Sequence, residues 1–367
     1  MRRLATPVVG GIALALLGLL PVTASPSTAA PAAPTSTTTP ASASPSAKAA
    51  PRKWDTRVFA RVPAPGYPAY VHAHTNGRVY AGSYKAGSAR SKVFEWSARG
   101  TLLRSWTVPG QRLGSDPGVQ VANQTRDGRL VLLETSRRAV MTLDVRSGRF
   151  RTIATFPSGA VPNYATWGPD GDLYVTDYHQ PIIWRLEHGS RTPERWFRSA
   201  ALNGTEFGAT GIAYRPGRGD LVISQQAVLD GSQLPVNGAL YSLPITPSGK
   251  PGAIRELWQS RPLDLPDGFG IGRSGNIYVA TVGTNQIVEL TASGKELGRF
   301  PELPLAGQTG AAIPFDTPCS ATFLGTTVLV ANQSAIFGQA GNQAILQVEV
   351  GERGRRPFLP RTATFTR

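Results

Sequence analysis

Residues 162–177 read PNYATWGPDGDLYVTD. Two short runs of apolar and β-branched residues flank a turn at Gly171, a pattern typical of two strands joined by a tight turn. Residues 266–281 read PDGFGIGRSGNIYVAT and repeat the arrangement around Gly275. In both copies a side-chain amide or carboxylate, Asn163 or Asp267, stands eight residues before the turn glycine. The two stretches predict a repeating strand–turn–strand unit with a polar side chain at the start of its first strand.

Weaker copies of this unit recur along the rest of the chain. Neighbouring turn glycines lie 43 to 56 residues apart, at Gly77, Gly128, Gly171, Gly219, Gly275 and Gly325. Repeats of roughly 40–50 residues made of strands are typical of β-propellers, in which each blade has four strands. We therefore predict an all-β fold, a six-bladed β-propeller of four-stranded blades.

Two segments are candidates for the strand that closes the ring. Residues 57–63, RVFARVP, resemble an outermost strand without inner strands of its own, and they precede the first full unit. The tail from Phe358 to Phe365 is the alternative. We favour the early segment, because an N-terminal strand added to the last blade would protect the open edge of that sheet.

The N-terminal residues have the features of a secretory signal peptide. Arg2 and Arg3 precede an apolar run, and small residues offer a cleavage site after residue 24 or as late as residue 30. Residues 25–52 are almost all Ala, Pro, Ser and Thr, a composition that does not bury enough apolar surface to fold. We expect a signal peptide over 1–24, a disordered linker over 25–52 and the propeller over 53–367.

Charge and cysteine content restrict the partners of the protein. The net charge is +15, but the basic residues are scattered apart from Arg353, Arg355 and Arg356, so we predict no nucleic-acid partner. No segment beyond the signal peptide is apolar enough to span a membrane. Cys319 is the only cysteine, which excludes an intramolecular disulfide. We expect a secreted monomer, extracellular or associated with the cell wall, that acts on a small molecule.

The two polar positions of the repeat point to a site on the propeller axis. Asn163 and Asp267 belong to the third and fifth units, so their oxygens would approach the axis from different directions. Oxygen ligands alone suit a hard cation, most plausibly calcium. The simpler explanation is that Pro-Asn and Pro-Asp-Gly are ordinary turn sequences. The matched register in two units favours the site.

These motifs give the chain a resemblance to a known family. Over residues 60–360 it resembles the SMP-30/gluconolactonase family of six-bladed propellers, which is itself similar to the paraoxonases. The resemblance rests on Pro162-Asn163, on residues 169–177 and on residues 266–268. It implies that Asn163 and Asp267 are metal ligands at the top of the channel, and that Asp267 is also the general base.

One expected ligand of that family is missing from this sequence. Family members supply a glutamate from the first strand of blade 1, but residues 66–74 here read GYPAYVHAH and contain no carboxylate. The blade-2 asparagine of the family has no secure match either; the nearest polar groups are Asp116 and Gln120. Other polar or reactive side chains are predicted at the same rim. The rim candidates are Asp116, Gln120, Glu134, Asp177, His179, Cys319 and Asn332.

Glu134, Asp177 and the histidines each have two interpretations. A rim carboxylate such as Glu134 or Asp177 either restores the missing negative charge or caps loop amides. His72 and His74 share one side of a predicted strand. They either bind a transition metal or are ordinary buried histidines, and the lack of a third ligand favours the latter.

Two functions follow, from different classes. The first is a metal-dependent hydrolase of a lactone or small ester at the channel mouth, with Asn163 and Asp267 holding the metal and Asp267 accepting a proton. The second is a non-enzymatic binding propeller for a small molecule, glycan or peptide. The preserved Asn and Asp favour the hydrolase, whereas the absent glutamate favours the binding protein.

Overall fold

The computed structural model describes residues 50–84, 89–115, 118–204, 208–228, 237–336 and 338–365. The predicted signal peptide and Asp116 lie outside these residues, as does nearly all of the predicted linker. In the part of the chain that is described, no helix is long and apolar enough to cross a membrane.

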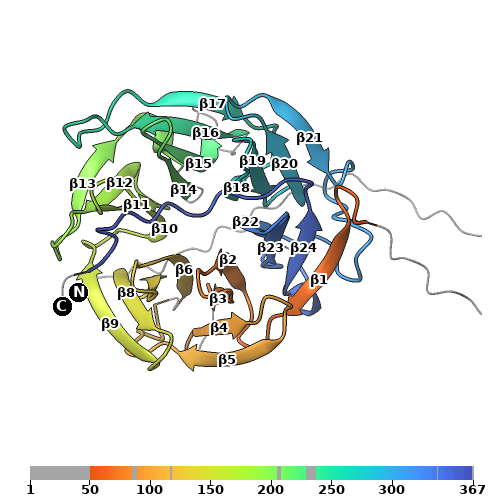
Figure 1. Ribbon diagram of the computed structural model, residues 1–367, viewed down its shortest axis with the longest axis horizontal. Helices are drawn as coiled ribbons and strands as arrows, with labels where there is room; N and C mark the ends of the chain where they lie inside the picture. The colour runs from red at the N-terminus through yellow and green to blue at the C-terminus, as the bar shows by residue number, and fades with distance from the viewer. Residues whose placement is uncertain are drawn as a thin grey trace, which may run out of the picture. The chain divides into compact units, whose positions relative to one another are not determined.

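The described chain forms six four-stranded antiparallel sheets around a central axis (Figure 1). The six-bladed propeller predicted from the turn glycines is therefore confirmed. Blades 1 to 3 consist of β2 (Pro68–Ala73), β3 (Val79–Ser83), β4 (Lys92–Trp96) and β5 (Leu102–Thr107); β6 (Val119–Gln124), β7 (Leu130–Glu134), β8 (Ala139–Asp144) and β9 (Arg149–Thr155); and β10 (Pro162–Trp167), β11 (Leu173–Asp177), β12 (Ile182–Leu186) and β13 (Glu194–Arg198).

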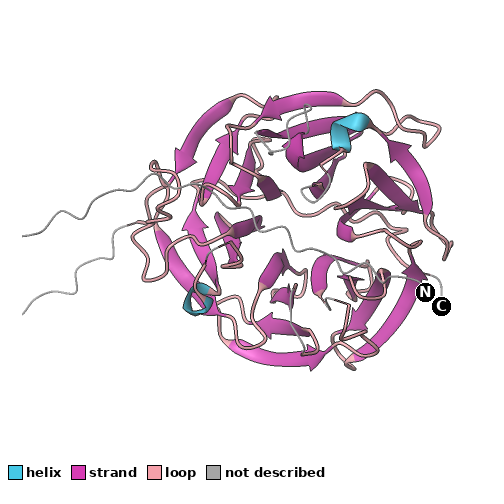
Figure 2. Cartoon of the chain, turned by 180° about the vertical axis from the view of Figure 1, so that it is seen from behind, coloured by secondary structure: helices cyan, strands magenta, loops and turns pink. Residues whose placement is uncertain are grey.

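The remaining blades follow the same order, except that the last one takes its outer strand from the N-terminal side. Blades 4 to 6 consist of β14 (Ala209–Arg215), β15 (Asp220–Val228), β16 (Asn237–Pro244) and β17 (Arg255–Gln259); β18 (Pro266–Ile271), β19 (Ile277–Thr281), β20 (Gln286–Leu290) and β21 (Glu296–Phe300); and β22 (Pro318–Leu324), β23 (Thr327–Asn332), β24 (Ala344–Glu349) and β1 (Thr56–Arg61). Two short 3₁₀ helices, η1 (Ala200–Leu202) and η2 (Ala340–Asn342), lie in connections on the face shown in Figure 2.

Ring closure follows the favoured prediction. Strand β1 pairs with β24, with Thr56 opposite Val348 and Arg61 opposite Ala344. Phe59 of β1 is buried in a cluster that includes residues of blades 1 and 6. Because β1 covers the outer edge of the last blade, that sheet has four strands like the other five.

The tail that was the alternative closing strand crosses the ring instead. We call residues 353–363 the strap. Its start bonds to blades 5 and 6, through Gly354 N to Gly325 O and Arg355 N to Ile271 O. Its end accepts a hydrogen bond at Ala363 O from Arg126 N of blade 2. The strap therefore spans the face of the propeller on which the inner strand of each blade turns into the second strand (Figure 1).

Candidate functional site

The register of the inner strands brings one side chain from each blade toward the axis. In five blades the first residue of the inner strand pairs with the last residue of the second strand, as Pro162 pairs with Asp177 and Pro266 with Thr281. In blade 4 the first residue, Ala209, pairs with Gln225, three residues before the end of β15. The next residue of the inner strand is the equivalent position in all six blades. In blade order these residues are Ala69, Gln120, Asn163, Thr210, Asp267 and Cys319.

Asn163 and Asp267 meet at this hub through a third residue, Tyr70. The Tyr70 hydroxyl lies 2.9 Å from Asn163 Oδ1 and 2.6 Å from Asp267 Oδ1. The three side chains come from blades 3, 5 and 1, and all are buried, with residue exposures of 5% for Asn163, 7% for Asp267 and 3% for Tyr70. The structure thus brings together the two residues singled out by the sequence, with a phenol hydroxyl between them.

A bulge in β2 explains how Tyr70 reaches the hub. Ala69 pairs with Gly82 and Val71 pairs with Ala81, so Tyr70 is the extra residue of the bulge. Its φ angle is 46°, in the left-handed region that side chains rarely adopt. The Tyr70 ring also stacks on Tyr164, with centroids 4.0 Å apart.

The second carboxylate oxygen of Asp267 is bound from blade 4. Gln226 Nε2 donates to Asp267 Oδ2 at 3.1 Å, and the Tyr178 hydroxyl donates to Gln226 Oε1 at 2.7 Å. The backbone at Asp267 is fixed by Ser224, whose hydroxyl donates to the Asp267 carbonyl at 2.7 Å. A chain of hydrogen bonds therefore runs from Tyr178 through Gln226, Asp267 and Tyr70 to Asn163.

Burial sets the protonation of this chain. Desolvation raises the pKa of Asp267 from 3.8 to about 7, against the lowering effect of hydrogen bonds from Tyr70 and other donors. Burial and the Asp267 charge raise the pKa of Tyr70 well above its usual value, so the phenol keeps its proton. With Asp267 protonated, its Oδ1 donates to the Tyr70 oxygen, and Tyr70 donates to Asn163. In this arrangement one hydrogen lies between Asp267 and Tyr70, and another lies between Tyr70 and Asn163.

Gln120 and Cys319 are two further residues of the hub. Gln120 is buried, and its Oε1 has no hydrogen-bond partner among the residues described. Cys319 is buried; its thiol donates to the Pro68 carbonyl at 3.5 Å, and desolvation raises its pKa well above the usual value. A thiol held in its neutral form is a poor nucleophile, so Cys319 is a packing residue of the hub.

Glu134, Asp177 and Asn332 cap loops rather than reach the hub. Glu134 accepts from the backbone amides of Ser136 and Arg137 at 3.0 and 2.9 Å. The same position in blade 3, Asp177, accepts from three backbone amides and from the Trp184 indole. In blade 6, Asn332 bonds the backbone of Asp316, Pro314 and Asn342. Of the two interpretations considered for the rim carboxylates, the structure supports capping.

The histidines also take structural positions. Both ring nitrogens of His74 have hydrogen-bond partners among the described residues. Nδ1 accepts from the Asn76 amide, and Nε2 lies 3.1 Å from Gly128 O. His72 Nε2 lies 3.2 Å from Gln124 Oε1. His179 is exposed, and its backbone amide bonds to Asp177. Asp116, the remaining rim candidate, lies outside the described residues.

The described hub does not fit a calcium ion. Calcium takes six to eight oxygen ligands. Here one amide oxygen and one carboxylate oxygen both face the Tyr70 hydroxyl, and the other carboxylate oxygen is taken by Gln226. Within the described ranges, no group of three His, Cys, Asp or Glu side chains is arranged to hold a metal ion. The hub is better described as a hydrogen-bonded acid than as a cation cage.

Tyr70 and Gln226 are the hub residues that the sequence did not reveal. Strict alternation along the strand places Ala69, not Tyr70, at the hub position, and nothing in the local sequence marks the bulge. Gln226 follows Gln225, which is the last residue of β15 that pairs with the inner strand β14. The pairing of β15 with β16 becomes irregular at the same point. A polar residue near the end of the second strand of blade 4 was the only available signal.

Comparison with known proteins supports the fold. No family profile matches the chain, and no curated protein matches it significantly. Among solved structures, a gluconolactonase from Xanthomonas campestris shares 18% identity at a TM-score of 0.53, covering 81% of this chain and 88% of its own. Regucalcin from Agrobacterium tumefaciens, a calcium-binding protein, shares 15% identity at a TM-score of 0.57, covering 85% and 97%.

A lyase has the same architecture. Virginiamycin B lyase from Staphylococcus aureus shares 17% identity at a TM-score of 0.52, covering 78% of this chain and 82% of its own. At such identities these likenesses establish a shared propeller fold. Because proteins of different activity share it, the reaction has to be argued from the hub residues.

Proposed function

We propose that this gluconolactonase-like propeller is a hydrolase of a lactone or another small ester, and that Asp267 is its general base. The observation that carries the proposal is a buried carboxyl whose pKa is raised to about 7. A general base works best when its pKa lies near the operating pH, and desolvation in a polar hub is a common way to reach that value. Tyr70, whose hydroxyl is hydrogen bonded to Oδ1 of Asp267, would orient this carboxyl.

The proposed reaction uses only water and the substrate. Ionised Asp267 takes a proton from a water molecule while the water oxygen bonds to the carbonyl carbon. The tetrahedral intermediate then breaks its bond to the alcohol oxygen, which takes the proton back from Asp267. An ester gives a carboxylic acid and an alcohol, whereas a lactone gives one hydroxy acid, and in both cases the carboxylate of Asp267 is restored.

We further propose that this reaction needs no divalent cation. The resemblance implied calcium bound by Asn163 and Asp267, but Tyr70 and Gln226 engage the oxygens that calcium would use. Chelation with EDTA should therefore leave turnover unchanged. Loss of turnover with EDTA and its recovery with calcium would restore the metal-dependent alternative.

The experiment is a panel of lactones and small esters assayed with the wild type and with Asp267→Asn. This substitution suits the hub, because the new amide can donate to Tyr70 and accept from Gln226 as protonated Asp267 does. We expect the variant to fold normally and to lose at least about 10²-fold of turnover, in line with loss of a general base. Equal turnover by wild type and variant would contradict the proposal.

The second candidate function is a binding propeller without catalysis. It is favoured by the burial of the hub, where Tyr70, Asn163 and Asp267 are all nearly inaccessible in the described structure. On this alternative, a small molecule, glycan or peptide would bind over the hub and be released unchanged. Saturable binding of a lactone with no turnover in the same panel would favour it.

We also propose that the protein is exported and acts as a monomer. The N-terminal sequence supports export, with Arg2 and Arg3 before an apolar run and a small-residue cleavage site. Mass spectrometry of the mature chain from culture medium tests this, with a new N-terminus between residues 25 and 31 expected. Retention of residues 1–24 inside the cell would contradict it. Light scattering, which measures the molar mass in solution, tests the proposed monomeric state.

A further inference from the structure

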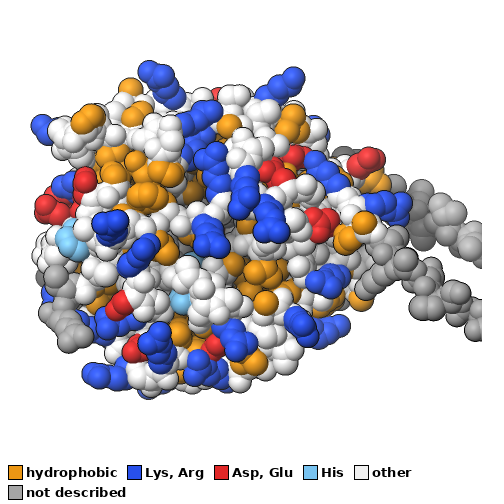
Figure 3. Space-filling view, viewed as in Figure 1, with side chains coloured by type: hydrophobic (Ala, Val, Ile, Leu, Met, Phe, Trp, Pro, Cys, Tyr) orange, Lys and Arg blue, Asp and Glu red, His pale blue; other side chains and the backbone are white. Residues whose placement is uncertain are grey.

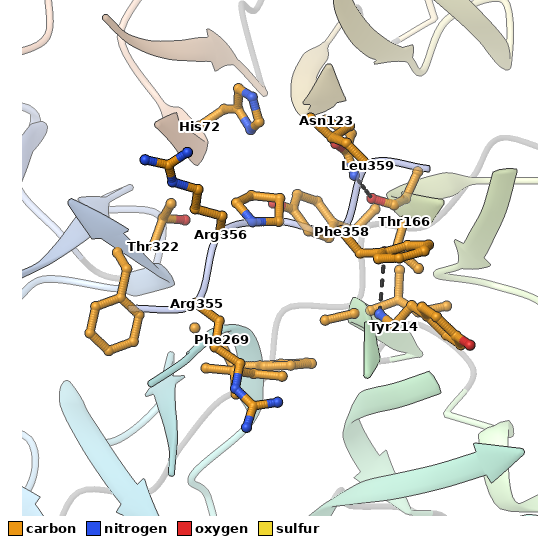
Figure 4. Close-up of a pocket in the computed structure, with 18 of the residues that line it drawn as sticks. His72, Asn123, Thr166, Tyr214, Phe269, Thr322, Arg355, Arg356, Phe358 and Leu359 are labelled. Atoms are coloured by element: carbon orange, nitrogen blue, oxygen red, sulfur yellow. Dashed lines mark hydrogen bonds between the residues drawn. The ribbon is translucent and has the colours of Figure 1, made fainter. Parts of the chain in front are cut away.

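A cavity lies at the opposite end of the central channel from the hub. The hub residues stand at the starts of the inner strands, whereas this cavity is lined by the later residues of the same strands and is crossed by the strap (Figure 4). Its volume is about 300 Å³. Tyr164 lines the cavity and stacks on Tyr70, so the two aromatic rings separate it from the Asp267 carboxyl.

The walls of the cavity are largely apolar and aromatic. They come from several blades and from the strap, and the principal wall residues are Tyr164, Ile212, Tyr214, Phe269, Phe323 and Phe358. The Phe358 ring packs 4.9 Å from Tyr214, which holds the strap over the cavity. Ligand sites of small molecules typically combine such walls with a few polar groups and begin at about 300 Å³.

His72 supplies one of those polar groups. The Thr75 amide donates to Gln124 Oε1 at 2.9 Å, which fixes the orientation of the Gln124 amide. His72 Nε2, 3.2 Å from the same oxygen, must therefore carry the imidazole proton. Nδ1 is then an acceptor, and it has no hydrogen-bond partner among the described residues. Burial lowers the pKa of His72 to about 3, so the ring stays neutral.

The strap supplies positive charge. Arg355 and Arg356 line the cavity and are exposed, and neither forms an ion pair within the described part of the chain. In Figure 4 the Arg356 guanidinium is seen on the His72 side of the strap, and Arg355 on the Phe269 side. Figure 3 shows a band of basic side chains across the middle of this face, with hydrophobic surface on either side. Arginine is well suited to bind a planar carboxylate.

We propose that this cavity is a second binding site, for a small aromatic carboxylate that carries a hydroxyl group. The ring would pack among the aromatic walls, the carboxylate would pair with Arg355 or Arg356, and the hydroxyl would donate to His72 Nδ1. The site is separate from the hub and involves none of the residues proposed for hydrolysis.

The test is calorimetric titration of the full-length mature protein with 3-hydroxybenzoate and 4-hydroxybenzoate. The neutral 3-hydroxybenzamide is the matched ligand without the charge. The double variant Arg355→Gln/Arg356→Gln removes both guanidinium groups at exposed positions, so it should fold. Arg353→Gln is the matched control, because Arg353 lies in the same strap but does not line the cavity.

We expect one saturable site for a hydroxybenzoate. The double variant should weaken its affinity about tenfold or more, since hydrogen bonds to charged groups are among the stronger ones. Arg353→Gln should weaken the affinity less than about twofold. Hydroxybenzamide should bind about as weakly to wild type as the acid does to the double variant. Absence of saturable binding by either acid, or equal affinity for the wild type and the double variant, would overturn the proposal.

A second variant tests the role of His72. His72→Phe keeps a ring but removes the acceptor nitrogen, so it should weaken the preferred hydroxybenzoate and leave unsubstituted benzoate unaffected. Equal effects on both compounds would overturn this part of the proposal. Asp267→Asn should not change either affinity, so failure of the hydrolase proposal would leave this result intact.

Discussion

At the scale of single residues, the hub is a buried acid that is hydrogen bonded from blades 1 and 4. Asp267 has one oxygen on Tyr70 and the other on Gln226, and water is nearly excluded. Desolvation outweighs these hydrogen bonds, so the folded protein holds the proton to about pH 7. The same competition that makes Asp267 a candidate base also makes the stability of the fold depend on pH.

Asp267→Asn should remove this pH dependence. Between pH 4 and 7 the Asp267 carboxyl of the folded wild type binds a proton that the unfolded chain has lost, so the contribution of Asp267 to stability falls as pH rises through that window. The buried His72, whose pKa is lowered to about 3, contributes an opposite slope in wild type and variant alike, so the difference between the two slopes isolates Asp267. The slope is at most about 1.4 kcal/mol per pH unit, and the total at most about 4 kcal/mol. Urea unfolding from pH 4 to 8 measures it. The exposed Asp170→Asn control should keep the wild-type slope; a variant slope equal to that of the wild type would contradict the account.

Tyr70→Phe should raise the pKa of Asp267 above about 7, because the hydrogen bond from Tyr70 lowers that pKa in the wild type. Leaving Asn163 Oδ1 and Asp267 Oδ1 without the hydroxyl that both contact should cost about 1–3 kcal/mol of unfolding free energy. Tyr164→Phe is the control, since no described residue bonds to the Tyr164 hydroxyl. Denaturant unfolding measures the cost, and equal stabilities of the two variants would show that the Tyr70 hydroxyl makes no net contribution.

The sequence predicted the positions of Asn163 and Asp267 at the hub but not what lies between them. Their shared register is visible in two clear copies of the repeat, since side-chain direction follows strand register. Tyr70 was missed because a bulge with positive φ breaks the alternation on which the prediction relied. Glu134 and Asp177 accept hydrogen bonds from loop amides. The sequence did not decide between this capping role and a role as a replacement for the missing glutamate.

At the scale of elements, the blades repeat one pairing pattern with local irregularities. Turn glycines and alternating apolar residues predicted the strands, and the N-terminal segment was correctly placed as the closing strand β1. The path of the tail was not predictable, because its contacts with Ile271, Gly325 and Arg126 are remote in sequence. Contacts of that kind depend on the closed ring rather than on any local pattern.

Removal of β1 should open the ring at blade 6. A chain beginning at residue 64 would leave the edge of β24 unpaired. It would also lack Phe59 and Val62, which would expose the remaining residues of their hydrophobic cluster. We expect a lower melting temperature and self-association through the open edge. A chain beginning at residue 50 is the control. Size-exclusion chromatography and thermal unfolding check the result, and a stable monomer without β1 would contradict the closure.

At the scale of the whole molecule, the central channel has a different chemistry at each end. One end holds the Asp267 hub, and the other holds the strap with its arginines and aromatic cavity. The Tyr70 and Tyr164 rings lie between them. The strap and the residues that follow it also contribute packing, since Ala363 is fully buried and the Phe365 ring lies 5.2 Å from that of Trp167.

Ending the chain after residue 352 should therefore destabilise the propeller without unfolding it. The loss includes the packing of Phe358 and Phe365, at about 1.5–3 kcal/mol for each large side chain that is fully buried and less for these partly buried ones. Thermal unfolding of the truncated and full-length chains measures the difference. An unchanged melting temperature would show that the strap does not pack on the ring as described.

The most direct test of the account is the titration of the Asp267 carboxyl itself. Carbon NMR of protein labelled at aspartate carboxyls, with Asp267→Asn to assign the signal, follows its protonation from pH 3 to 9. We expect a midpoint near pH 7, because burial raises the pKa of this carboxyl. A midpoint near pH 4 would contradict it, because such a carboxyl would be solvated and the proposed base would have no perturbed proton affinity.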